Sequence, residues 1–202
     1  MINALILAAG ESRRMGMPKP LLKFSDTTFL ERIIAVLRDC DVDRIMVVLG
    51  ARAELVRTSV DLSDVDVVVN KDYQQGQLSS LVKGLQSLSD RTEAILVCLV
   101  DHPFVTTAIV NRLIAAFRET RRPIVVPVFN GRRGHPALFA NSLFDELANA
   151  PVDKGARHVV ASNADKVLEV DVADRGVLMS IDTPEDYRSC FGAEPQVIVK
   201  KP

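Results

Sequence analysis

Tryptophan is absent from this 202-residue sequence, and only two tyrosines and eight phenylalanines supply aromatic rings. The charges are nearly balanced, with 25 Lys and Arg against 26 Asp and Glu, and the formal net charge is −1. A nucleic-acid-binding protein normally combines a basic surface with aromatic side chains on which bases stack. The balanced charge and the small number of aromatic residues argue against a nucleic-acid partner. Only a local basic site remains compatible with this composition.

Cysteine and long apolar runs are also scarce. Cys40, Cys98 and Cys190 are widely spaced, odd in number and without a CxxC pattern, which argues against a disulfide framework. No apolar run approaches the roughly 18 residues needed to cross a membrane. The apolar start, Met1–Gly10, lacks the basic segment of a signal peptide. We therefore expect a soluble, cytoplasmic protein with no membrane partner.

Apolar runs and helical patterns alternate along the first two thirds of the chain. Nearly continuous apolar runs are typical of strands buried on both faces of a parallel sheet. Such runs occupy Ala4–Ala8, Arg44–Leu49, Val65–Val69, Ala94–Val100 and Pro123–Phe129. Between them, apolar residues recur at the spacing of a helix face. The order predicts a single-domain, Rossmann-like α/β fold, in which helices sandwich a mostly parallel sheet.

The pattern weakens after Phe129 but still indicates several elements. We expect a short helix that Asn141 caps and a final helix that starts at Pro184. Further strands are predicted at Ala137–Phe139, Lys166–Val170 and Val177–Ile181. No linker separates two domains, so we predict one domain over residues 1–193 and a loosely held tail over 194–202.

A loop with two glycines follows the first predicted strand. Residues 7–19 read LAAGESRRMGMPK and place small residues and three cations at the C-terminal end of that strand. Ligands of open α/β sheets bind at such strand ends. There, backbone N–H groups and cationic side chains can hold phosphate oxygens. The spacing of Gly10 and Gly16 matches neither a Walker loop nor GxGxxG. An ordinary solvated loop is the alternative, but phosphate binding is the favoured interpretation.

Two aspartates, Asp101 and Asp182, each follow a predicted strand. Mg²⁺ is typically bound by one or two carboxylates together with phosphate oxygens of the substrate, and this pair can supply the carboxylates. Helix capping is the alternative for an aspartate at such a position. Near Asp182, however, Thr183 fits the N-cap, Pro184 the first helical position and Asp186 the third. Asp182 is thus free for another role.

The loop motif LAAGxSxRMGxPK resembles the signature of nucleotidyltransferases related to the molybdenum cofactor cytidylyl- and guanylyltransferases. The resemblance implies a fold of the nucleotide-diphospho-sugar transferase type and a loop that holds a nucleoside triphosphate. Arg14 and Lys19 match the signature cations, and Ala9 resembles the cytidylyl branch, since the guanylyl branch usually carries Gly there. The implied nucleotide-binding residues of the loop are Leu7, Ala8, Ala9, Gly10, Glu11, Ser12, Arg14, Gly16 and Lys19.

Two acidic segments extend the resemblance. Asp101-His102-Pro103 is similar to the family's Asp-x-Pro element, whose Asp binds Mg²⁺. The segment 180–186, SIDTPED, resembles the family's DIDTPED but carries Ser180 at the first acidic position. The resemblance therefore implies Asp101 and Asp182 as the metal ligands.

Two polar segments extend it further. Residues 76–81, GQLSSL, are similar to a Gly-x-x-Ser-Ser-Leu element beside the nucleotide, which implies Gly76, Ser79 and Ser80 as nucleotide-binding residues. Simple helix initiation is the alternative for that segment. The segment 134–136 resembles the Gly-His-Pro element of the cytidylyl branch and implies acceptor binding by Gly134, His135 and Pro136. A structural role for the lone histidine is the alternative.

The resemblance implies transfer of CMP from CTP to the phosphate of molybdopterin, with release of pyrophosphate. Mg²⁺ is the implied cofactor, a molybdoenzyme an implied recipient of the product, and Arg14, Lys19 and Asp101 the implied catalytic residues. A phosphate monoester is largely ionised at pH 7, so the acceptor needs no dedicated base. One alternative is a related nucleotidyltransferase that uses another nucleotide or phosphate acceptor. The other is a nucleotide- or cofactor-binding protein without turnover.

Overall fold

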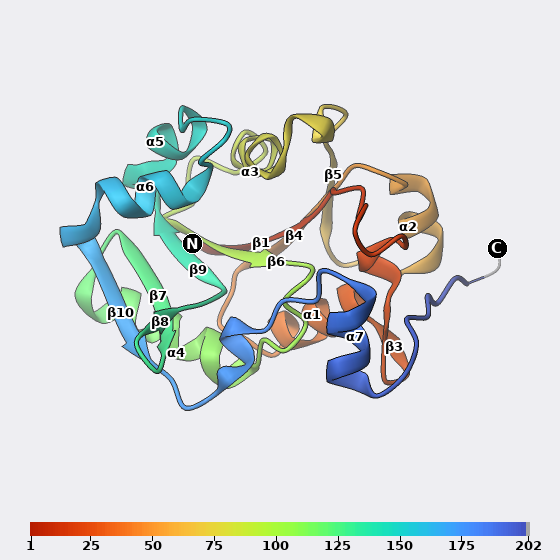
Figure 1. Ribbon diagram of the computed structural model, residues 1–202. Coiled ribbons are helices and arrows are strands. Elements are labelled where there is room, and N and C mark those ends of the chain that lie inside the picture. Colours follow the sequence, from red (N-terminus) through yellow and green to blue (C-terminus); the bar gives the residue numbers. More distant parts are fainter. Residues whose placement is uncertain (201–202) are drawn as a thin grey trace.

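A central sheet with helices on both faces forms the body of the molecule, in a computed structural model that describes residues 1–200 (Figure 1). The strand order is β10-β7-β9-β6-β1-β4-β5, with β8 paired to β7. All neighbours are parallel except β9, which runs antiparallel to β6 and β7, and β8. The strands of this sheet are β1 (Ile2–Ala8), β4 (Arg44–Leu49), β5 (Asp66–Val69), β6 (Ala94–Leu99), β7 (Ile124–Phe129), β8 (Arg132–Arg133), β9 (Ala137–Ala140) and β10 (Val167–Asp171). The predicted α/β fold with a mostly parallel sheet is confirmed.

Helices cover the sheet in two layers. Figure 1 shows α3, α5 and α6 on one face and α1, α4 and α7 on the other. Alternate residues of β1 feed both layers, because Ala4 and Ile6 pack in the core on the α1 side while Leu5 and Leu7 pack on the α3 side. The helices are α1 (Phe29–Arg38), α2 (Ala53–Ser59), α3 (Gln77–Leu85), α4 (Thr107–Thr120), α5 (Phe144–Ala148), α6 (Ala156–Ser162) and α7 (Pro184–Phe191). Among residues 1–200, every helix is too short or too polar to span a membrane.

Two helices begin with the same reciprocal cap. At α1, the Thr28 side chain accepts from the backbone N–H of Glu31, whose carboxylate accepts from Thr28 N–H. At α7, Thr183 and Asp186 make the same pair of bonds. Such boxes satisfy backbone donors that the first helical turn leaves free. The predicted start of the last helix, with its Thr183 cap, is therefore confirmed.

Two predictions of local structure were wrong. Val177–Ile181 is not a strand, because Arg175–Leu178 forms a 3₁₀ turn and the chain then runs to α7 without pairing in the sheet. Its backbone groups bond to loops instead, and Ile181 N–H donates to the carbonyl oxygen of Asp101 at 2.8 Å. Asn141 does not cap a helix either, since its side chain donates to the carbonyl oxygen of Thr92. An apolar run and an Asn at a boundary do not reveal which distant partners satisfy the backbone.

The order in which strands are added to the sheet reverses at β1. From β1 the chain proceeds to β4 and β5 on one side, and then crosses to β6 on the other. Loops after β1 and β6 therefore diverge and leave a crevice at their C-terminal ends, where open α/β sheets bind ligands.

Part of the segment 194–202 is attached to the body of the protein. Ile198 N–H donates to Leu21 O, and Lys23 N–H donates to Gln196 O, at 2.9 and 2.7 Å. These bonds fix the short two-stranded sheet of β2 (Lys23–Phe24) and β3 (Thr27–Thr28) from one side. The last two residues of the expected tail, 201–202, lie outside the described residues.

Candidate active site

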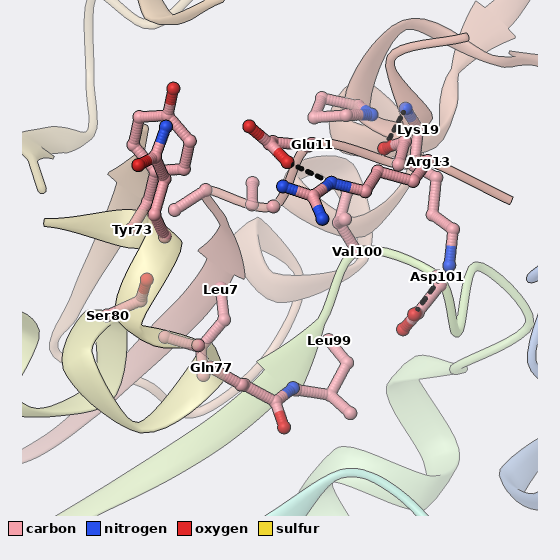
Figure 2. A pocket seen from close by; sticks show the side chains of 17 residues that line it. Leu7, Glu11, Arg13, Lys19, Tyr73, Gln77, Ser80, Leu99, Val100 and Asp101 are labelled. Atoms are coloured by element: carbon pink, nitrogen blue, oxygen red, sulfur yellow. Dashed lines mark hydrogen bonds and ion pairs between the residues drawn. The ribbon is translucent and has the colours of Figure 1, made fainter. Parts of the chain in front are cut away.

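A cavity of about 340 Å³ opens at the switch point of the sheet. Its walls come from three places: the loop after β1, the start of α3 and the end of β6. Figure 2 shows Tyr73 and Ser80 on one side and Lys19 and Asp101 on the other. Of the sequence-predicted nucleotide-binding residues, it is lined by Leu7, Ala8, Ala9, Gly10, Glu11, Ser12, Lys19, Gly76 and Ser80. The structure thus brings segments far apart in sequence to one cavity.

The loop after β1 is folded by its own polar groups. Ser12 and Gly16 have left-handed backbones, with φ of 57° and 74°, and Gly16 N–H donates to Ser12 O at 2.9 Å. The Ser12 hydroxyl oxygen accepts from the backbone N–H of Lys19 at 3.1 Å. Gly16 therefore has a left-handed backbone conformation that residues with a side chain rarely adopt. Gly16 does not line the cavity, and Ser12 holds the two ends of the loop together.

Lys19 joins the two predicted metal carboxylates. Its side chain is nearly buried, and its ammonium donates to Asp101 Oδ2 at 2.9 Å and to Asp182 Oδ1 at 2.6 Å. The Arg14 guanidinium, which is largely exposed, reaches Asp182 Oδ1 at 3.0 Å and does not line the cavity. The four side chains that the resemblance implies for catalysis and metal binding are therefore in contact in the fold.

The electrostatics of this cluster keep Asp182 ionised. Burial opposes its ionisation, but the hydrogen bond from Lys19 and the charges of Lys19 and Arg14 outweigh it, and they hold the pKa of Asp182 below its usual value. Asp182 lies directly before Thr183, the N-cap of α7, and not at a strand end as predicted. Thr183 and Asp186 cap the helix as predicted, so Asp182 is not needed for that task.

The loop before α3 is organised by an asparagine that the sequence analysis missed. Asn70 is buried, and its side-chain amide donates to the hydroxyls of Ser79 and Ser80 at 2.9 and 3.0 Å. Its side-chain oxygen accepts from Asp72 N–H. Ser80 lines the cavity, whereas Ser79 lies outside it and donates to backbone carbonyls. A signal was available in the sequence, because an Asn directly after a strand often organises a turn.

Gly50 was also missed, and its reason is spatial. A methyl group at Gly50 would lie 2.6 Å from the carbonyl oxygen of Ala9 and 2.8 Å from Cβ of Tyr73. The loop after β4 therefore approaches the wall of the cavity as closely as only glycine allows. A sequence alone does not reveal such an approach.

A second cavity, of about 370 Å³, adjoins the first and shares Leu7, Gln77 and Leu99 with it. Apolar side chains of α3, β6, β9 and α6 form most of its surface, and Arg133, His135 and Arg157 stand among them. Gly134 and His135 of the predicted acceptor segment line it, whereas Pro136 is buried outside it. The described lining contains no acidic residue, so the chemistry suits an apolar ring system that carries negative charge.

Two histidines lie side by side between the cluster and this cavity. The rings of His102 and His135 are 4.7 Å apart at their centroids, and both Nδ1 atoms are buried without a protein partner. Burial, reinforced by His102, lowers the pKa of His135 to about 4, and burial also lowers the pKa of His102. The lowered pKa values favour the neutral form of both imidazole rings at pH 7.

The donor set around Lys19 fits a divalent cation that is shared with a substrate. Within residues 1–200, no group of three His, Cys, Asp or Glu side chains converges to hold a metal by protein ligands alone. Asp101 and Asp182 both accept from the Lys19 ammonium, so their carboxylates lie near each other. Mg²⁺ typically uses one or two carboxylates, and phosphate oxygens and water complete its coordination.

A family model described as MobA-like NTP transferase domain matches residues 4–167. The chain belongs to this family. Among its curated relatives, nicotine blue oxidoreductase of Paenarthrobacter nicotinovorans is 30% identical over 93% of this chain and 95% of the relative. Molybdenum cofactor cytidylyltransferase of Escherichia coli (strain K12) is 28% identical over 92% and 93%. The recognition of a family related to the molybdenum cofactor nucleotidyltransferases is confirmed.

Solved structures of the same size superpose on this MobA-like chain. Rv0371c from Mycobacterium tuberculosis H37Rv matches with a TM-score of 0.86 and 35% identity, over 95% of this chain and 97% of that one. Its manganese complex matches with a TM-score of 0.82 and 33% identity, over 95% and 98%. The fold is thus the nucleotide-diphospho-sugar transferase type that was expected.

Proposed function

We propose that this MobA-like protein transfers CMP from CTP to the phosphate of molybdopterin and releases pyrophosphate. The observation that carries the proposal is the junction of two cavities at Leu7, Gln77 and Leu99, with the cluster of Lys19, Asp101 and Asp182 at the rim of the first. The first cavity takes the nucleotide, and the apolar second cavity takes the ring system of the acceptor. Ala9 and the full-length relation to the Escherichia coli cytidylyltransferase favour CTP.

The reaction is a phosphoryl-centred displacement that requires alignment and charge more than a protein base. An ionised oxygen of the acceptor phosphate forms a bond to the α-phosphorus, and the bond from that phosphorus to the β-phosphate breaks. The electron pair leaves with pyrophosphate, so no proton need be removed from the nucleophile. Lys19 and Arg14 stabilise the negative charge that builds on the triphosphate. His135, at the wall of the second cavity, contacts the acceptor.

Asp101 and Asp182 are the residues that would hold Mg²⁺. When bound there, the cation neutralises triphosphate charge and helps to orient the α-phosphate. Lys19 keeps the two carboxylates close together, and the backbone bond between Ile181 and Asp101 links their two loops. These contacts give the site its shape before substrate enters.

The test measures pyrophosphate release with Mg²⁺ and molybdopterin, comparing CTP, GTP, ATP and UTP. We expect turnover that prefers CTP and requires molybdopterin. GTP preference would overturn the base assignment, and release of pyrophosphate only with another phosphate compound would overturn the acceptor. Nucleotide binding without any release would identify a binding protein on an enzyme fold.

Asp101 supplies the matching variant. Asp101→Ala should lower turnover by about 10²–10³ because one preorganised electrostatic contact is lost. Asp90→Ala, at an exposed aspartate outside both cavities, is the control and should keep wild-type rates. Near-normal release by Asp101→Ala would remove this residue from the mechanism.

A further inference from the structure

The carboxylate of Asp186 makes two contacts beyond the reciprocal capping bonds. Besides the capping bond from Thr183 N–H at 2.8 Å, Asp186 Oδ2 accepts from the backbone N–H of Asp182 at 3.0 Å and from the Thr183 hydroxyl at 2.9 Å. One oxygen therefore fixes the backbone at Asp182, the residue whose side chain meets Lys19.

The segment that carries Asp182 is anchored on its N-terminal side by Ile181, whose side chain is fully buried in the core. It lies in no strand, and the backbone bond from Ile181 to Asp101 holds it on its N-terminal side. Asp186 holds it on the C-terminal side. Together the two contacts fix the backbone on both sides of one carboxylate, so its direction towards Asp101 and Lys19 is set by the first turn of α7.

The chain contains its own control for this contact. The box at α1, formed by Thr28 and Glu31, has the same reciprocal bonds and lies outside both cavities. The Glu31 carboxylate accepts from Thr28 N–H and pairs with Lys200, but it contacts no residue of the cluster. The two boxes do the same for their helices, and only the second also holds a cluster carboxylate.

We propose that Asp186 is a positioning residue for divalent-cation binding, which acts by fixing the backbone of Asp182. This inference rests on the proposed role of Asp182 as a metal ligand. Outer residues that orient metal ligands typically contribute 10- to 100-fold to metal affinity. Asp186 itself touches neither cation nor substrate, so its removal should weaken cation binding while nucleotide recognition by the β1 loop continues.

The experiment titrates Mn²⁺ into the full chain, followed by electron paramagnetic resonance, with saturating CTP and separately with GTP. Asp186→Ala should weaken Mn²⁺ binding 10- to 100-fold, while Glu31→Ala should bind as wild type after a similar loss of thermal stability. Asp186→Asn keeps an oxygen that accepts from Asp182 N–H and should stay within about threefold of wild type. In turnover, the concentration of Mg²⁺ that gives half the maximal rate should rise in parallel for Asp186→Ala.

Equal Mn²⁺ affinities in Asp186→Ala and Glu31→Ala would overturn the proposal, as would a failure of Asp186→Asn to restore binding. If Asp186→Ala does not fold, Asp186→Glu and Glu31→Asp replace the pair, each moving one carboxylate by one methylene. Only Asp186→Glu should then weaken Mn²⁺ binding. A wild-type protein that binds Mn²⁺ with nucleotide but does not turn over molybdopterin would refute the proposed acceptor and leave this result standing.

Discussion

At the scale of single residues, Gly10 lines the first cavity and Gly50 packs behind its wall, and the two glycines have opposite surroundings. A methyl group added at Gly10 meets no protein atom within 4 Å. The backbone of Gly10 is not left-handed, so an alanine there would not be strained. Gly50, by contrast, has no room because Ala9 and Tyr73 press against it. The protein therefore needs Gly50 for its own packing, whereas the space beside Gly10 opens towards the proposed phosphates.

Substituting each glycine by alanine should separate these roles. Gly50→Ala should lower the free energy of unfolding by about 1–3 kcal/mol because backbone and Tyr73 must move. Gly10→Ala should leave stability within about 0.5 kcal/mol and weaken nucleotide binding at least tenfold. Urea unfolding and a CTP titration are the measurements. Wild-type CTP affinity in Gly10→Ala would show that no phosphate approaches that backbone.

At the scale of elements, the segment before β9 and the loop after β6 meet through a pair of half-buried histidines, His135 and His102. His135 is neutral in the fold, with a pKa of about 4, whereas an unfolded chain has a histidine pKa near 6.5. The unfolded state therefore takes up a proton first as the pH falls from 6.5 towards 4. Stability supplied by the neutral ring is fully present above pH 6.5 and is lost across that window.

His135→Gln should make the protein less sensitive to acid. Between pH 7 and pH 5, the wild type should lose more unfolding free energy than the variant, by at most about 2 kcal/mol. The same variant should raise the KM for the acceptor and leave the KM for CTP unchanged, since His135 lines only the second cavity. An identical pH dependence of stability in both proteins would contradict the neutral buried ring.

Much of the architecture at this scale was predictable from the sequence. Continuous apolar runs gave β1, β4 and β6 because strands buried on both faces leave that pattern. The Val177–Ile181 run is similarly apolar but forms no strand. Its backbone bonds instead to His135 and Asp101, which are far away in sequence. The loop motif predicted residues that line the first cavity, and the position of Asn70 after a strand was a further local signal. Gln77 and Gly50, by contrast, matter through spatial neighbours that no local pattern encodes.

At the scale of the whole molecule, the C-terminal segment supports the stretch of chain that directly follows the loop after β1. Residues 196 and 198 bond to the chain at Lys23 and Leu21, shortly after Lys19. Lys200 also pairs with Glu31 on α1, on the surface. The segment 196–200 is thus attached to the folded body through its backbone more than through its charges.

Deleting residues 195–202 should lower the free energy of unfolding by about 1–3 kcal/mol, since two backbone bonds and the pairing they support are lost. Lys200→Ala removes only a surface ion pair and should cost no more than about 1 kcal/mol. Urea midpoints of the two proteins measure the difference. A deletion as mild as Lys200→Ala would mean that the backbone pairing contributes nothing to stability.

The two adjoining cavities are lined by different parts of the chain. The first is built from residues 7–101, whereas most of the second comes from one continuous block, residues 126–161. Under the proposed division of roles, a change of acceptor requires substitutions in that block, and the residues of the first cavity, which bind the triphosphate, can stay unchanged. Transplanting the block between MobA-like relatives, as a cassette, is therefore the economical route to hybrid enzymes with new acceptors.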